Sequence, residues 1–392
     1  MHRPPSLRTA RLAVSTSFFV SGAVLASWVP HIPAMQRALD LSPGLLGLVL
    51  LSPALGAVIA MLVSGGLCAR WGHARVNRGA TFLYCCAVPL TVLAPHPILL
   101  ACVLVVMGFN NGTLGVAMNA EAIEVERAYG RLINSSFHAL YGLGLLVGAS
   151  AGGLVIGMGG SPLAHLLVAA ALLGFLGVGA SFRYLSDAPS KAAGGRAPLF
   201  VRPTRFLLLL GIGTFSCSLI EGAMADWAGI YLRDVRGAAP GLAAMGFAAY
   251  SFAMTLSRFA GDSLNQQLGK RGLVRLGGFL GVAGVALALG VRHPLAAVAG
   301  FGLVGLGMAN VVPNFFSDAA REPSMPPSRA IAAVSSLGYA GILMGPPIIG
   351  AVAQLTSLSA AMGVVAVSSA LVWALAGNLS GRPVLTRSLS AG

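Results

Sequence analysis

The chain has 392 residues, of which 56% are hydrophobic and 9% are charged, and its formal net charge is +14. So few charged residues cannot cover a soluble protein of this length, and the composition indicates a chain that lies mostly within a lipid bilayer. The basic residues stand between apolar runs and form no single basic surface. The charge therefore indicates membrane orientation and argues against nucleic acid as a partner.

Apolar runs long enough to cross the roughly 30 Å hydrocarbon core of a membrane recur along the whole chain. They predict an all-α integral membrane protein with twelve transmembrane helices. The predicted helices lie at residues 12–36, 43–69, 77–94, 97–122, 133–158, 162–184, 205–232, 241–264, 272–291, 294–317, 328–354 and 357–378.

The longest polar break, at residues 188–204, is rich in glycine and proline and predicts a cytoplasmic linker. It separates a six-helix half at residues 1–187 from a second six-helix half at residues 205–392. The two halves share residue types at an offset of 199, which indicates an internal duplication. The matching pairs are Trp28 and Trp227, Gly47 and Gly246, Gly108 and Gly307, and Asn111 and Asn310.

Small residues form stripes on two of the predicted helices. Gly144-x3-Gly148 in the fifth helix and Gly341-x3-Gly345 in the eleventh match at an offset of 197, which extends the repeat. Glycines three or four residues apart lie on one face of a helix and let a neighbouring backbone come close. We expect both stripes to be helix contacts.

The distribution of Lys and Arg predicts the topology. Most of the 25 basic residues lie at the termini or in the loops that follow even-numbered helices, whereas the other side keeps Arg37, Arg233, Arg236 and Arg292. Basic residues concentrate on the cytoplasmic side of membrane proteins, so we expect both termini to be cytoplasmic.

Glu221 and His138 are ionisable residues inside predicted helices, where a charge is costly unless it faces a wet cavity or a partner. Both are candidates to take up and release a proton, because histidine changes charge near neutral pH and a buried carboxyl group can be neutralised. The alternatives are a protonated Glu221 that hydrogen-bonds a neighbouring helix and a His138 that only packs. We expect Asp226 to point elsewhere and to cap its helix or pair with Arg233.

Four asparagines, Asn110, Asn111, Asn310 and Asn314, stand near the middle of the fourth and tenth predicted helices. A neutral amide both donates and accepts hydrogen bonds, so these residues are candidates to bind a hydroxyl-rich solute. The alternative is that they hydrogen-bond neighbouring helices.

Several short motifs add to the pattern of twelve helices in two halves. They are Asn119 to Glu126, Gly130-Arg131, Ser136-Phe137-His138, Glu221 to Trp227, Arg258-x-x-Gly261-Asp262 and Gly345-Pro346-Pro347. With these features the chain resembles the major facilitator superfamily (MFS) of membrane transporters over nearly its whole length. Within that superfamily it is similar to the branch of the bacterial inner-membrane protein YbjJ and the membrane protein MosC.

The resemblance implies two halves that rock around a site at the membrane midplane, a monomer, and a location in the bacterial cytoplasmic membrane. The first, fourth, seventh and tenth helices line the cavity in this family, so Trp28 and Trp227 would flank the solute. The alternative is that both tryptophans are anchors at the membrane interface.

The resemblance also implies a conformational latch. Arg258 and Asp262, four residues apart on one predicted helix, are similar to the second-half version of the family's latch motif. In the first half, Arg70 occupies the corresponding motif, but Ala69 replaces its acidic residue.

We therefore predict a secondary active transporter that moves a small polar solute, such as a sugar, polyol or amino-polyol, and is coupled to protons. Two alternatives stay open: a proton-driven exporter of amphipathic compounds, and a membrane receptor or scaffold that does not transport. Drug–proton antiporters carry a basic residue within the fourth helix, and its absence here counts against export. The sequence has no phosphate-binding loop, metal-ligand cluster or catalytic triad, so we expect no enzyme activity, metal or cofactor.

Overall fold

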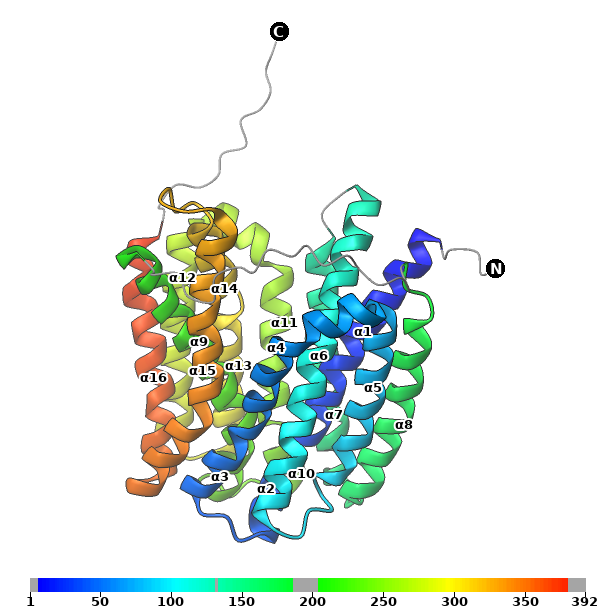
Figure 1. The fold of residues 1–392 in the computed structure, drawn as a ribbon. Helices are drawn as coiled ribbons and strands as arrows, with labels where there is room; N and C mark the ends of the chain where they lie inside the picture. Colours follow the sequence, from blue (N-terminus) through cyan, green and yellow to red (C-terminus); the bar gives the residue numbers. More distant parts are fainter. Residues whose placement is uncertain (1–5, 131–132, 186–203, 380–392) are drawn as a thin grey trace.

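The structure is a computed structural model and describes residues 6–130, 133–185 and 204–379. In these ranges helices run side by side in two bundles, which we call the N half and the C half (Figure 1). The N half consists of α1 (Leu7–Trp28), η1 (Val29–His31), α2 (Ile32–Ala38), α3 (Pro43–Leu50), α4 (Ser52–Trp71), α5 (His73–Leu90), α6 (Pro97–Tyr129), α7 (Asn134–Gly157) and α8 (Pro162–Ser181). The C half consists of α9 (Arg205–Asp234), α10 (Pro240–Ala244), α11 (Gly246–Phe259), α12 (Gly261–Gly290), α13 (Pro294–Met308), α14 (Val311–Ala319), α15 (Pro327–Leu355), α16 (Leu358–Leu375) and η2 (Ala376–Asn378).

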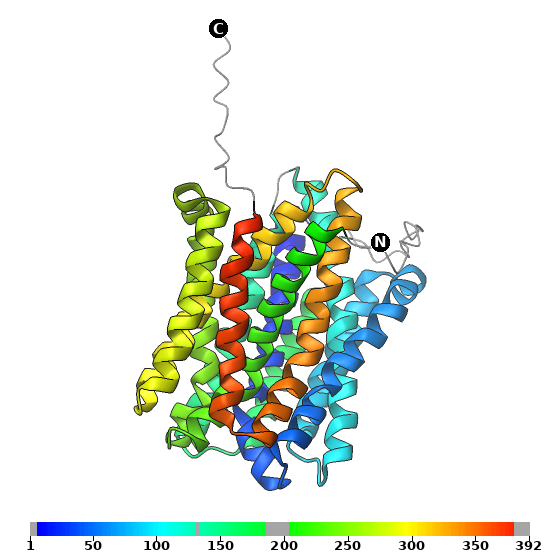
Figure 2. The same cartoon turned by 90° about the vertical axis from the view of Figure 1, so that its left-hand side faces the viewer.

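Helix occurs at each of the twelve predicted ranges, and the predicted all-α membrane fold is confirmed. Among the described residues, ten helical segments are long and apolar enough to cross a membrane. The other two predicted helices correspond to α5, which begins with His73 and carries Arg75 and Arg78, and to α11, which has 14 residues. Figure 2 shows the C half in front, with α16 nearest the viewer.

The predicted helix at residues 241–264 was wrong at its end. α11 stops at Phe259, and α12 starts at Gly261 and continues across a kink at Gly269, where φ is 67° and ψ is 164°. Glycine adopts this backbone without a steric penalty. Arg258 and Asp262 therefore belong to different helices and do not share one helical face.

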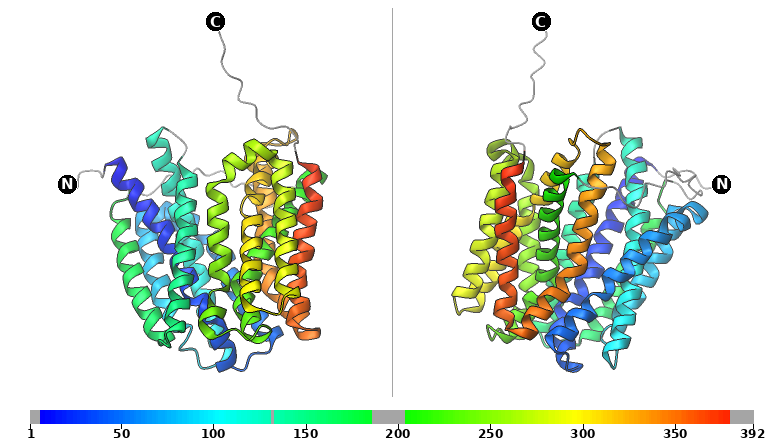
Figure 3. Two further views of the ribbon diagram at one scale, coloured as in Figure 1. Left: turned by 180° about the vertical axis from the view of Figure 1, so that it is seen from behind. Right: turned by 60° about the vertical axis from the view of Figure 1, so that its left-hand side comes forward.

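The bundle has two chemically distinct ends. One end, which we call the terminal face, holds the start of α1, α7 and α9 and the end of α16; the other, the far face, holds α2, α3 and α10 (Figures 1 and 3). At the far face the Arg233 guanidinium donates to the carbonyl oxygen of Pro33 and, at 2.8 Å, to Oε1 of Gln36. The backbone N–H of Gly44 donates to Oε1 of Gln354 at 3.3 Å. These contacts join the halves and close the far face.

The glycine stripes predicted from the sequence are confirmed as helix contacts. In the N half, a methyl group on Gly144 of α7 would collide with the carbonyl oxygen of Phe19 on α1. In the C half, a methyl group on Gly341 of α15 would collide with the carbonyl oxygen of Phe215 on α9. The same close approach of two helices thus occurs in both halves.

The contacts also set the register of the repeat. Gly108 approaches the carbonyl oxygen of Pro53, and Gly305 approaches that of Tyr250, so equivalent contacts in these helices are 197 residues apart. The offset of 199 read from the sequence is two residues out of this register, which is about 200° around an α-helix. Residues matched at 199, such as Asn111 and Asn310, therefore face different sides of their helices.

Candidate solute cavity between the halves

A cavity of about 740 Å³ lies between the two halves. Its walls come from α1, α4, α6 and α7 of the N half and from α9, α11 and α15 of the C half. Most lining side chains are apolar. The polar and aromatic exceptions include Trp28, Tyr84, Asn111, Asn119, His138, Tyr141, Glu221, Asp226 and Tyr339.

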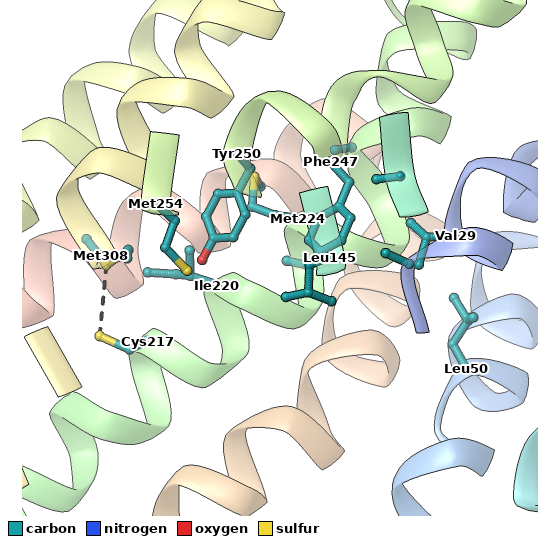
Figure 4. Packing of buried hydrophobic residues seen from close by; sticks show 14 of the residues in the cluster. Val29, Leu50, Leu145, Cys217, Ile220, Met224, Phe247, Tyr250, Met254 and Met308 are labelled. Carbon is teal, nitrogen blue, oxygen red and sulfur yellow. Dashed lines mark hydrogen bonds between the residues drawn. The ribbon is translucent and has the colours of Figure 1, made fainter. Parts of the chain in front are cut away.

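Toward the far face the cavity is bounded by apolar side chains. Figure 4 shows Phe247 of α11 beside Leu145 of α7, with Val29 and Leu50 of the N half nearby. The Phe247 ring stacks on Tyr250 with a centroid distance of 6.0 Å. These residues and the contacts of Arg233 seal this end.

Glu221 and His138, the two predicted proton-coupling residues, both line the cavity and come from opposite halves. His138 lies near the start of α7 and is exposed, whereas Glu221 lies near the middle of α9 and is half-buried. Tyr141, one helical turn from His138, lies within electrostatic range of both Glu221 and Arg258. The structure thus brings an imidazole, a phenol and a carboxyl group to one space.

Asp226 also lines this cavity, contrary to the expectation that it points elsewhere and pairs with Arg233. Arg233 is two turns further along α9, and its guanidinium contacts Asp234, Pro33 and Gln36. A rise of about 1.5 Å per residue puts the two positions roughly 10 Å apart along the helix, which separates their side chains. The signal for Asp226 was present in the sequence, because a carboxyl group inside a membrane helix usually marks a functional site.

The N half contributes two amides to the cavity. Asn111 accepts a hydrogen bond from Ser21 Oγ at its Oδ1 atom, at 3.0 Å, so its NH2 group remains as a donor. Asn119 donates from Nδ2 to the carbonyl oxygen of Gly115 at 2.8 Å, so its Oδ1 atom remains as an acceptor. The sequence singled out Asn119 only as part of a motif.

The structure does not bring the other predicted amides, or Trp227, to the cavity lining. Asn110 is buried and donates to a carbonyl oxygen one turn earlier on α6. Asn310 donates to both the carbonyl and the hydroxyl oxygen of Ser257, and Asn314 donates to the carbonyl of Asn310. Trp227 is fully buried. For the asparagines, the alternative of hydrogen bonds within and between helices describes what is seen.

Two buried polar groups in the cavity wall lack a hydrogen-bond partner among the described residues. They are the indole N–H of Trp28, which is 3% exposed, and the hydroxyl group of Tyr84, which is 1% exposed. Buried polar groups in folded proteins nearly always have a partner. Both groups are therefore candidates to meet a polar solute.

The predicted latch residues lie toward the terminal face. Arg70 is exposed at the end of α4, with its guanidinium carbon 5.9 Å from the ring centroid of Trp71. Arg258 is exposed at the end of α11 and donates to the carbonyl oxygen of Ala309 at 3.4 Å. The side chain of Asp262 lies outside the described part of the structure, so the latch stays a prediction.

Two helical bundles around a shared cavity, with one end closed by contacts between them, define a membrane transporter of the alternating-access type. The chain matches the family model of the Major Facilitator Superfamily over residues 14–326, and it belongs to that superfamily. It is a transporter and not an enzyme.

Relatives and solved structures agree with this assignment. The chain is 37% identical to an uncharacterized MFS-type transporter of Yersinia pestis, over 91% of this chain and 92% of that protein. It is 31% identical to the membrane protein MosC of Rhizobium meliloti, over 92% of this chain and 88% of MosC. The crystal structure of the nucleoside transporter NupG has the same fold, with a TM-score of 0.72, 14% identity, and coverage of 94% of this chain and 97% of NupG.

Proposed function

We propose that this protein moves a small polar solute across the membrane by alternating access and couples the movement to protons. The observation that carries the proposal is the pairing, in one cavity, of His138 and Tyr141 from α7 with Glu221 from α9. Groups that gain and lose protons sit on opposite halves, so their protonation can depend on how the halves are arranged. Glu221 is the proton carrier in this scheme, and His138 supports it.

The polar groups of the N half suit a hydroxylated solute. Asn111 offers a donor and Asn119 offers an acceptor, and a hydroxyl group can satisfy both kinds of partner. The volume of about 740 Å³ is ample for a sugar or polyol. The likeness to NupG concerns the fold alone, so the solute class rests on the cavity.

The closed far face supports an assignment of the conformational state. With both termini in the cytoplasm, as the basic loops predict, the contacts of Arg233 and Gly44 close the outer side. The structure then corresponds to the inward-facing state. Transport would require these contacts to break while new ones form at the terminal face.

Export of amphipathic compounds is the second candidate, because most of the cavity lining is apolar. Leu25, Met61, Val116 and Phe247 would suit a hydrophobic solute. The carboxyl groups, amides and unpartnered Trp28 and Tyr84 groups in the same wall favour a polar one.

The purified protein tests the proposal in two steps. Thermal unfolding is first measured with sugars, polyols, amino-sugars and cationic amphiphiles at two pH values. Solutes that stabilise the protein are then loaded into proteoliposomes with an imposed pH gradient. We expect a polar solute to stabilise the protein and to move only with the gradient. Stabilisation by amphiphiles alone would support the exporter, and the absence of gradient-driven movement for every stabilising solute would contradict proton coupling.

A further inference from the structure

We propose that the solute carries a protonated amine and that Asp226 binds this group. The inference rests on the proposed function, because it names the solute class for the same cavity. It starts from the charge of the cavity wall. Glu221 and Asp226 both line it, whereas no Lys or Arg lines it in the part of the chain that the structure describes.

The two carboxyl groups differ in their surroundings. Near Glu221, the phenol groups of Tyr141 and Tyr250 lie within electrostatic range of both that carboxyl group and Arg258. A cation therefore stands close to the Glu221 side of the cavity. Its charge partly balances the carboxylate there.

Asp226 has no such partner. Among the described residues it makes no hydrogen bond or ion pair, and the guanidinium of Arg233 on the same helix is held by Asp234, Pro33 and Gln36. A carboxyl group inside a membrane helix is retained at a cost unless something of opposite charge or a hydrogen-bond donor reaches it. A protonated amine on the solute supplies both the charge and the donors.

The rest of the wall fits the remainder of such a solute. Asp226 is five residues beyond Glu221, about 7.5 Å closer to the far face along α9. Aromatic side chains line the cavity at Trp28, Tyr84 and Phe247, and aromatic faces attract organic cations. The unpartnered Trp28 and Tyr84 groups and the amide of Asn111 then remain for hydroxyl groups.

The division of labour between the carboxyl groups is specific. Asp226 binds the ammonium group, and Glu221 carries the proton. A change at Asp226 should therefore alter which solutes bind, and a change at Glu221 should alter how transport is driven. The two proposals can fail separately.

Matched pairs of solutes test the inference on the full-length purified protein at pH 7. The probes are N-methylglucamine against glucitol and ethanolamine against ethylene glycol, measured by thermal unfolding and by calorimetric titration. We expect the amine of each pair to bind about tenfold more tightly or better, because a desolvated charge pair is worth more than a neutral hydrogen bond. Asp226→Asn should remove this preference and leave glucitol binding unchanged.

Two further variants keep the test decisive. Asp226→Glu retains the charge and should retain the preference for amines, even if Asp226→Asn folds poorly. Asp40→Asn is the matched control, because Asp40 is exposed, lies outside the cavity and has a φ of 48°, which asparagine tolerates. Equal affinity within each pair, or no binding of either amine, overturns the amine proposal. Gradient-driven movement of a neutral polyol in that case would leave the transport proposal intact.

Discussion

The two halves of this transporter pack their helices alike but line the shared cavity with different chemistry. The close approach of Gly144 to Phe19 in the N half recurs as that of Gly341 to Phe215 in the C half. The polar lining does not recur: amides and an imidazole come from the N half, and carboxyl groups come from the C half. Helix contacts tolerate little change because each depends on an absent side chain, whereas cavity positions are free to diverge.

The repeat register shows the divergence residue by residue. Contacts between α1 and α7, and between α9 and α15, place Leu25 at the position that corresponds to Glu221, 196 residues later. Both side chains line the cavity, but only the C half has a carboxyl group there. The comparison implies that function resides in the few positions where the halves differ.

The largest effect is expected from removing the carboxyl group that only the C half possesses. Glu221→Gln should abolish gradient-driven uptake but leave solute exchange measurable, because the amide keeps the shape of the side chain and cannot carry a proton. Proteoliposomes with and without a pH gradient distinguish the two activities. Glu124→Gln is the control, since Glu124 lies outside the cavity with an oxygen 3.7 Å from Nε2 of His73. Normal driven uptake by Glu221→Gln would remove the proton-carrier role.

The shared packing predicts equal damage in both halves. Gly144→Ala and Gly341→Ala each place a methyl group against a carbonyl oxygen of the neighbouring helix. Each should destabilise the protein by about 1–3 kcal/mol, the usual cost of overpacking. Thermal unfolding in detergent measures this loss, and Gly363→Ala, which meets open space in α16, should be close to neutral. A loss confined to one half would break the comparison.

The place where the halves hold each other gives a third prediction. Arg233→Gln removes the donor to the Pro33 carbonyl and should weaken the far-face contact by about 1.5 kcal/mol, as expected for a charged hydrogen bond. The balance would then shift about tenfold toward the outward-facing state. Labelling of single cysteines at each face reads out this balance. Unchanged labelling would show that Arg233 does not control closure.

Much of the fold could be predicted from the sequence, because long apolar runs and basic loops report directly on the membrane. The kink at Gly269 and the break between Phe259 and Gly261 could not, since they interrupt hydrophobic patterns that continue on both sides. The break moved Asp262 onto a different helix from Arg258. Position along a run is visible in a sequence, whereas interruption of its hydrogen bonds depends on packing.

The candidate site was predicted in part. Glu221, His138, Asn111 and Trp28 reach the cavity, but Asn310 does not. The error came from the offset of 199, because identical residue types coincided two positions away from equivalent contacts. A better signal was available: His96 and His293 each precede a proline, accept a hydrogen bond at the start of their helix, and are 197 residues apart. A capping residue fixes register because its position is set by the backbone.

The smallest effects should come from the two asparagines that the sequence matched and the structure separates. Asn111→Ala removes an amide from the cavity wall and should lower solute affinity several-fold, with little change in stability, because its bond to Ser21 is half-buried. Asn310→Ala removes the donor to Ser257 at the break between α13 and α14 and should cost about 1 kcal/mol of stability, with unchanged affinity. Thermal unfolding and solute titration of both variants separate the two roles. Loss of affinity in Asn310→Ala without loss of stability would restore the symmetric site that an offset of 199 implies.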